Sequence, residues 1–336
     1  MFSQNGLSLD QAPPISVVFR FFLSGALFGI LAGMMILVYH DRIFDLSDPA
    51  ARILTHTLTL GVMLSFMFAA LFQMLPVIAG VKLSAPITKA NLLLYPFVLG
   101  IFFLLGAFAL PEQTWLFLAA SLLLGTSILW ISLVMLKKLF ALSHHSSSSK
   151  GMSAALVSLG IVILLALYMT WTLSGLLGGE EYQKIKIAHY SFGLFGWIAL
   201  LIISISFQVI EMFYVTPAYP KKIADTLPII LVALLLTTLA LSFWISGVWQ
   251  VSHTLIAITL SGYALLTLRK LSQRKRPVAD ATVWFWRAGL AALLIAMAAL
   301  LIDKLTDNML AMKIFAIFYA VFALSIVLAM FYKIVP

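Results

Sequence analysis

The run of residues from His56 to Gly80, HTLTLGVMLSFMFAALFQMLPVIAG, is the feature that most constrains the fold of this chain. It contains no charged side chain, and about 20 apolar residues are enough for a helix to cross the hydrocarbon of a bilayer. A histidine lies at its start, and a Phe–Gln pair that ends at Gln73 lies near its end. Because an ionisable side chain inside a membrane is costly and rare, His56 needs a structural or functional reason.

Apolar runs of this kind continue along the whole chain. Hydrophobic residues make up 63% of the sequence, charged residues 10%, and the mean hydropathy is +1.09, whereas soluble domains carry about 25% charged residues. Unbroken apolar runs predict helices, since the strands of a membrane barrel would alternate. We therefore predict an all-α, polytopic membrane helix bundle that forms a single transmembrane domain over residues 1–336. The predicted spans are 16–39, 50–80, 90–110, 114–138, 152–177, 185–215, 223–246, 248–269, 281–303 and 309–334.

The composition also excludes several classes of function. The chain has no cysteine, which excludes disulfides, thiolate metal sites and iron–sulfur clusters. Its net charge of +9 resides in short loops between the spans, so we expect anionic lipid of the bilayer rather than nucleic acid as the partner. No Walker loop, GxSxG, HExxH or EF-hand motif is present, and ordinary hydrolase and nucleotide chemistry has no support.

The distribution of Lys and Arg predicts the orientation. The loops after even-numbered spans hold twelve of these residues and those after odd-numbered spans hold five, so the N-terminus and the even loops are expected in the cytoplasm of a bacterium, with the spans in its inner (plasma) membrane. Two further histidines, His144 and His145, would lie in a flexible cytoplasmic loop. Four histidines would then share one layer near the outer face: His40, His56, His189 and His253.

Spacing within the long runs indicates an internal repeat. Gly61 precedes Gln73 by twelve residues, and Gly196 precedes Gln208 by twelve in HYSFGLFGWIALLIISISFQVIEMFYV. A weaker copy, AMKIFAIFYAVFALSIVLAMFYKIVP, lies at the end of the chain. The copies fall on the second, sixth and tenth spans, which predicts parallel repeats of four helices. Because the last copy ends at Pro336 without a polar tail, we expect a C-terminal truncation.

The segments ARILTHTLTLGVMLSFMFAALFQMLPVIAG, AHYSFGLFGWIALLIISISFQVIEMF and MFYKIVP resemble divergent membrane proteins related to haem–copper oxidase subunit I and to the NnrS family. The resemblance covers most of the chain as a helix plan, although its specific motifs cover a small part. It implies a bundle with pseudo-threefold symmetry whose second, sixth and tenth helices carry haem ligands near the outer face. On this resemblance His56 and His189 match the ligand positions of the second and sixth helices, and the tenth has no histidine.

Departures from the oxidase pattern narrow the expected function. An oxidase centre needs six histidines within the membrane, and this chain has three besides His40. Ser191 also stands where many relatives have a second histidine, and no His-x-x-x-Tyr pattern follows His189. We therefore expect a haem-binding protein without a complete oxygen-reducing centre and without copper. Its cofactor-binding residues would be His56, His189 and His253, with His56 and His189 as ligands of the haem iron.

Such a protein would serve electron transfer, nitric oxide handling or metallocentre maturation, and whether it is an enzyme stays open. A redox partner or oxidase-related subunits are the expected protein partners. The alternatives are a cofactor-free transporter or permease and a structural or assembly subunit. In these alternatives the histidines make structural hydrogen bonds, with Thr55, Thr57, Thr59 and Ser191 near His56 and His189, and with Ser252 and Thr254 beside His253.

Other intramembrane polar residues allow two interpretations each. Gln73 and Gln208 would form interhelical hydrogen bonds or line a polar path. Glu211 would snorkel toward Lys221 and Lys222 or admit protons from the cytoplasm. Arg287 would join an aromatic belt of tryptophans, or pair with Glu211 or a haem propionate.

Overall fold

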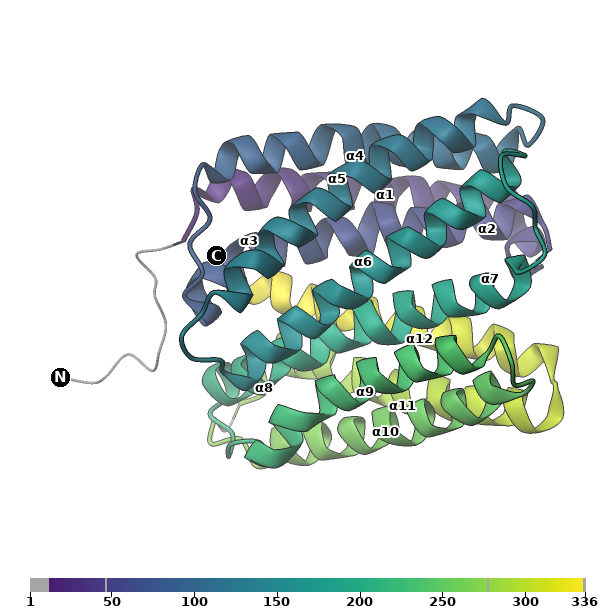
Figure 1. Ribbon diagram of the computed structural model, residues 1–336. Coiled ribbons are helices and arrows are strands. Elements are labelled where there is room, and N and C mark those ends of the chain that lie inside the picture. The colour runs from purple at the N-terminus through teal and green to yellow at the C-terminus, as the bar shows by residue number, and fades with distance from the viewer. Residues whose placement is uncertain (1–11, 46, 277, 335–336) are drawn as a thin grey trace. The chain divides into compact units, whose positions relative to one another are not determined.

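In this computed structural model, which describes residues 12–45, 47–276 and 278–334, all regular secondary structure of the described residues is helical (Figure 1). Ten helices among them are long and apolar enough to cross a membrane. The predicted all-α, polytopic membrane helix bundle is confirmed at this level. The elements in chain order are α1 (Ile15–Tyr39), η2 (His40–Phe44), α2 (Pro49–His56), η3 (Thr57–Leu64), α3 (Ser65–Ala79), α4 (Pro86–Ala109), α5 (Trp115–Phe140), α6 (Ser147–Leu173), α7 (Tyr182–Ser191), η4 (Phe192–Ala199), α8 (Leu200–Tyr214), α9 (Lys221–Leu241), α10 (Val248–Ser272), α11 (Ala281–Thr306) and α12 (Met309–Ile334).

One predicted loop is shorter than expected. Helix α6 begins at Ser147, five residues before the predicted span 152–177, so the serines after His144 and His145 are largely helical rather than flexible. The reason is capping, because the Ser146 hydroxyl accepts the Ser149 N–H at 3.1 Å and a serine in this position satisfies an otherwise unpaired donor of the first turn.

The chain forms two compact units. The first contains Met1–His144 and Leu159–Tyr190, and the second contains His145–Ser158 and Ser191–Pro336. In the first unit α1 packs against α3 and η3, and α4 packs along α5; in the second, α11 packs between α10 and α12 (Figure 1). The single domain expected over residues 1–336 stays a prediction.

Aromatic side chains fill the interior of each unit. In the first, the Phe21 ring stacks on Phe72 at 5.5 Å, and Phe68 meets Phe97 edge-on at 6.0 Å. In the second, Phe195 meets the Tyr319 ring edge-on at 5.9 Å. Tilted and edge-on rings at these separations add attraction beyond the burial of their area.

Two long helices change to π-helical hydrogen bonding over eight residues, η3 after α2 and η4 after α7. These segments begin at residues 57 and 192, which are 135 positions apart, as are Gly61 and Gly196 within them. Helix α12, which holds the third sequence copy, is α-helical throughout its described length. A π segment of this length is rare, and such segments occur often at functional sites.

The glycine of each π segment lies against a close neighbour. A Cβ added at Gly61 would lie 2.5 Å from the Phe28 ring, and one added at Gly196 would lie 2.8 Å from the Ser158 hydroxyl. Both glycines therefore allow close packing within their own units, as the sequence predicts for small residues in membrane helices.

We predict that Gly61→Ala destabilises the protein by about 1–3 kcal/mol, because the added methyl group overpacks the contact with Phe28. The measurement is thermal unfolding in detergent. Gly29→Ala is the matched control, since a Cβ there meets no heavy atom within 4 Å. Equal melting temperatures for the two variants would contradict the close contact.

Asp280 caps the N-terminus of α11 and joins it to α12. Its carboxylate accepts hydrogen bonds from the Val283 N–H at 3.1 Å, the Thr282 hydroxyl at 2.6 Å and the Lys333 ammonium at 2.6 Å. Partial burial favours the neutral acid, but the hydrogen bonds from Lys333, Thr282 and Val283 outweigh it and lower the pKa of Asp280 to about 2.

This lowered pKa predicts a loss of stability in acid. The ionised carboxylate stabilises the folded state above the unfolded pKa of about 3.9, and this contribution disappears as the pH falls toward the folded pKa. We expect the melting temperature to fall between about pH 4 and pH 2, and Asp280→Asn to be less stable at neutral pH with a smaller fall in that window. An unchanged acid dependence in Asp280→Asn would show that the cap contributes nothing.

Candidate functional site

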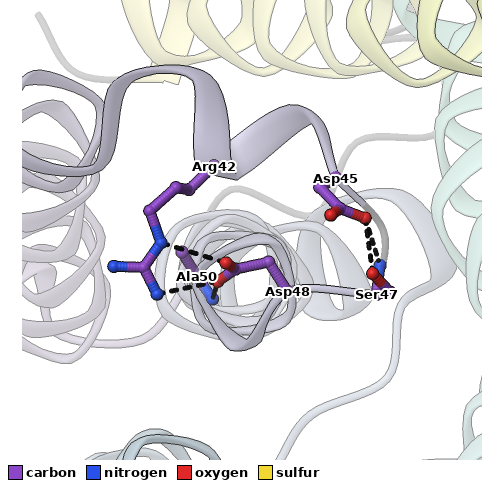
Figure 2. Close-up of polar contacts among 5 residues, drawn as sticks. All are labelled: Arg42, Asp45, Ser47, Asp48 and Ala50. Atoms are coloured by element: carbon purple, nitrogen blue, oxygen red, sulfur yellow. Dashed lines mark hydrogen bonds and ion pairs between the residues drawn. The ribbon is translucent and has the colours of Figure 1, made fainter.

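The start of α2, the helix that carries His56, is fixed by a charged cap (Figure 2). The Asp48 carboxylate accepts the Ala50 N–H at 2.7 Å, and the Arg42 guanidinium donates to its two oxygens at 3.0 and 3.2 Å. The hydrogen bond from Arg42 holds the pKa of the Asp48 carboxyl below its ordinary value. Pro49 then occupies the first helical position, where its missing N–H costs nothing.

His56 presents its outer ring nitrogen without a partner. Its Nδ1 lies 2.8 Å from the carbonyl oxygen of Arg52, and because a carbonyl only accepts, Nδ1 carries the proton and Nε2 has the lone pair. Among the described residues Nε2 has no hydrogen-bond partner, although the ring is half-buried. The ring lies 4.9 Å from that of Phe108 in α4.

The nearby threonines do not satisfy this histidine. Thr57 donates to the carbonyl of Ile53 and Thr59 to that of Thr55, both at 2.8 Å. Two of the hydroxyl partners that the structural alternative expects for His56, those of Thr57 and Thr59, are thus bound to their own helix.

His189 repeats this arrangement in the same unit. It is the eighth residue of the helical run that begins at Tyr182, as His56 is the eighth of the run that begins at Pro49. Its Nδ1 lies 3.2 Å from the carbonyl oxygen of Val162 in α6, the interhelical bond that the structural alternative predicts. The Nε2 atom again has no partner among the described residues.

The imidazoles of His56 and His189 lie within range of an electrostatic interaction. Both belong to the first unit. The structure thus places two of the three histidines predicted to bind a cofactor in one unit, and within the described residues neither Nε2 has a hydrogen-bond partner.

His253 is packed differently, inside the second unit. Only 1% of its surface is exposed, and its Nε2 lies 2.8 Å from the Ser191 hydroxyl. Its ring also contacts those of Trp249 at 5.5 Å and Phe195 at 5.9 Å. This hydrogen-bonded, enclosed geometry favours a structural role for His253 over the predicted cofactor role.

The partner of His253 is not one of the two hydroxyls next to it in sequence. Thr254 donates to the Gln250 carbonyl, and the buried Ser252 hydroxyl has no partner among the described residues. The expectation that these neighbours satisfy His253 is wrong, because on one helix their side chains point elsewhere and the ring reaches Ser191 instead.

Of the other polar residues, Gln73, Gln208 and Glu211 differ from expectation, and Arg287 agrees with one of its two interpretations. Gln73 and Gln208 are half-buried and make no side-chain hydrogen bond within the described part of the chain. Glu211 accepts the Tyr219 N–H at 2.5 Å rather than pairing with a lysine of α9. The Arg287 guanidinium lies 5.0 Å from the centre of the Trp284 ring, as an aromatic belt predicts.

A hydroxyl cluster in the second unit is a feature that sequence reasoning missed. Tyr263 donates to the Ser206 hydroxyl at 2.8 Å and Tyr219 donates to Thr267 at 3.0 Å. The sequence did contain one signal for this cluster: Tyr263 and Thr267 are four residues apart on α10, so they lie on the same face of that helix. The first hydrogen bond connects α10 to α8, and the second connects α10 to the segment between α8 and α9, both in the interior of that unit.

The two histidines His56 and His189 are too few for a bare metal ion but enough for the iron of a haem. Within the described residues no group of three His, Cys, Asp or Glu side chains is placed to hold an ion, and a protein site for a bare zinc ion needs at least three protein ligands. Haem iron, whose porphyrin supplies four nitrogens, needs only one or two axial imidazoles. The anchored Nδ1 and unpartnered Nε2 of His56 and His189 fit that need.

Removal of the Ser191 hydroxyl tests the structural role of His253. We predict that Ser191→Ala lowers the free energy of unfolding by about 1–3 kcal/mol, because it takes a hydrogen bond from a buried imidazole. Chemical or thermal unfolding in detergent measures this. Ser47→Ala, at an exposed loop position, is the control, and a Ser191 variant as stable as that control would contradict the role.

Comparisons of the chain with protein-family models, with curated proteins and with solved structures give no match.

Proposed function

We propose that this chain is a haem-binding membrane protein whose axial ligands are the Nε2 atoms of His56 and His189. The observation that carries the proposal is that the two rings make the same hydrogen bond and expose the same ring nitrogen. Each donates Nδ1–H to a backbone carbonyl, and each Nε2 is unpartnered among the described residues. A hydrogen bond of this kind fixes the tautomer and orientation of a metal-binding histidine and raises its basicity.

Electron transfer is the function that this ligand pair favours among those considered. Bound haem would supply one-electron redox chemistry. If His56 and His189 both held the iron, the protein would supply two ligands to it, and a gas or substrate would have to displace one of them. A membrane-embedded electron carrier with a redox partner therefore fits better than nitric oxide handling.

The proposal includes the location and the helix plan predicted from the sequence. The excess of Lys and Arg in the even loops supports an N-terminus in the cytoplasm of a bacterium. The equivalent positions of the π segments η3 and η4 support a repeat of four helices, which is a feature of the oxidase subunit I resemblance. The second of these supports comes from the second and sixth spans, where the two histidines lie.

An absorption spectrum of the purified protein tests this function. We expect a Soret band that shifts on reduction, with the narrow α-band of a six-coordinate, low-spin haem. His56→Ala and His189→Ala should each abolish or strongly alter this band, because each removes one axial ligand.

His253→Ala is the matched control, since this histidine belongs to the second unit and is hydrogen-bonded by Ser191. It should keep the wild-type spectrum in the fraction that folds. A wild-type protein without any Soret band, after expression with sufficient haem, would refute the proposal.

A further inference from the structure

Arg52 lies one helical turn before His56 and is connected to it twice. Its carbonyl oxygen accepts the Nδ1–H of His56. Its guanidinium lies 5.8 Å from the centre of the Phe108 ring, and that ring lies 4.9 Å from the His56 ring. Phe108 therefore forms a bridge between the cation and the imidazole.

This guanidinium has no direct counter-ion among the described residues, although the Asp48 carboxylate interacts with it at longer range. It makes no ion pair or side-chain hydrogen bond there, whereas Arg42 is bound by both oxygens of Asp48. Arginine presents five donors in a planar fork that suits a carboxylate. The guanidinium of Arg52 is exposed and makes no side-chain hydrogen bond within the described residues, so its donors are available for an external anion.

Arg52 also lies within electrostatic range of the helix that carries the second histidine. Its charge acts on Tyr182, the first residue of α7, and His189 is in the third turn of the same helix. All of these residues belong to the first unit. The cation is therefore beside both ligand-bearing helices, toward the ends at which they begin.

We infer that Arg52 binds a carboxylate of the ligand held by His56 and His189, and that for haem this carboxylate is a propionate. The inference rests on the proposed function. Four residues of helix separate Arg52 from His56 by about 6 Å along the axis. The guanidinium is thus displaced from the imidazole toward the helix start, the direction in which charged substituents of a membrane-bound ring would reach water.

The cation–π contact with Phe108 prepares Arg52 for this role. Holding the guanidinium against a ring limits the rotamers that binding would otherwise have to freeze. The Phe108 side chain is itself 8% exposed and is supported by the edge of Phe117 at 5.8 Å. Arg52 is therefore a positioning residue for the anionic edge of the ligand.

The test compares haem with its dimethyl ester, which lacks the two negative charges. The full chain is purified in detergent without haem and titrated with each compound, and the Soret band reports binding. We expect the wild type to bind haem about tenfold or more tightly than the ester, the scale of a hydrogen bond to a charged group. Arg52→Gln should bring this ratio close to one while the low-spin spectrum persists.

Arg269→Gln is the matched control, since Arg269 is an exposed arginine of α10 in the second unit, and it should keep the wild-type ratio. Arg52→Lys retains the charge and should keep part of the preference if the glutamine variant does not fold. An Arg52→Gln protein with the wild-type ratio would overturn the inference and leave haem binding intact. A wild type that binds neither compound would refute both the inference and the proposed function.

Discussion

The need to hydrogen-bond every peptide group inside the membrane governs this structure. Helices meet it with one acceptor bond per carbonyl, and each carbonyl keeps a second lone pair. Intramembrane hydroxyls use this second lone pair repeatedly, as Thr57, Ser204 and Thr238 show with the residue four before each of them. His56 does the same through Nδ1. The backbone thus decides which histidine nitrogen faces outward, and with it the chemistry that the ring offers.

The same constraint explains the π segments. Inserting wider turns into a membrane helix is tolerated because each peptide group still finds a partner within the helix. The cost is looser helical packing, and in both segments a glycine sits where another residue approaches closely, Phe28 in the first unit and Ser158 in the second. The segments η3 and η4 have equal lengths, and each has its glycine at the same position. A common origin of the two long helices explains both features.

The sequence sufficed for the features that depend on local pattern. Apolar runs predicted ten spans with most boundaries correct within a few residues. The three predicted repeat copies include the two helices that share a π segment, but the third copy, in α12, has none within its described residues. It failed where a side chain chooses among partners distant in sequence. Ser191 and His253 are 62 residues apart, and no periodicity specifies that contact. Gln73 is a second failure of this kind. Glutamine in a membrane helix often hydrogen-bonds to a neighbouring helix, but no described residue offers the Gln73 side chain a partner.

Position along α2 links the features of the first unit. The bidentate pair of Arg42 and Asp48 fixes where the helix begins, and the helical repeat then sets the direction of every later side chain. Arg52 and His56, four residues apart, consequently share one face and one aromatic neighbour, Phe108. A loop ion pair remote from the ring thus determines the register of both the ligand and the cation beside it. A shift of the cap by one residue would rotate the pair by about 100° together, away from α4.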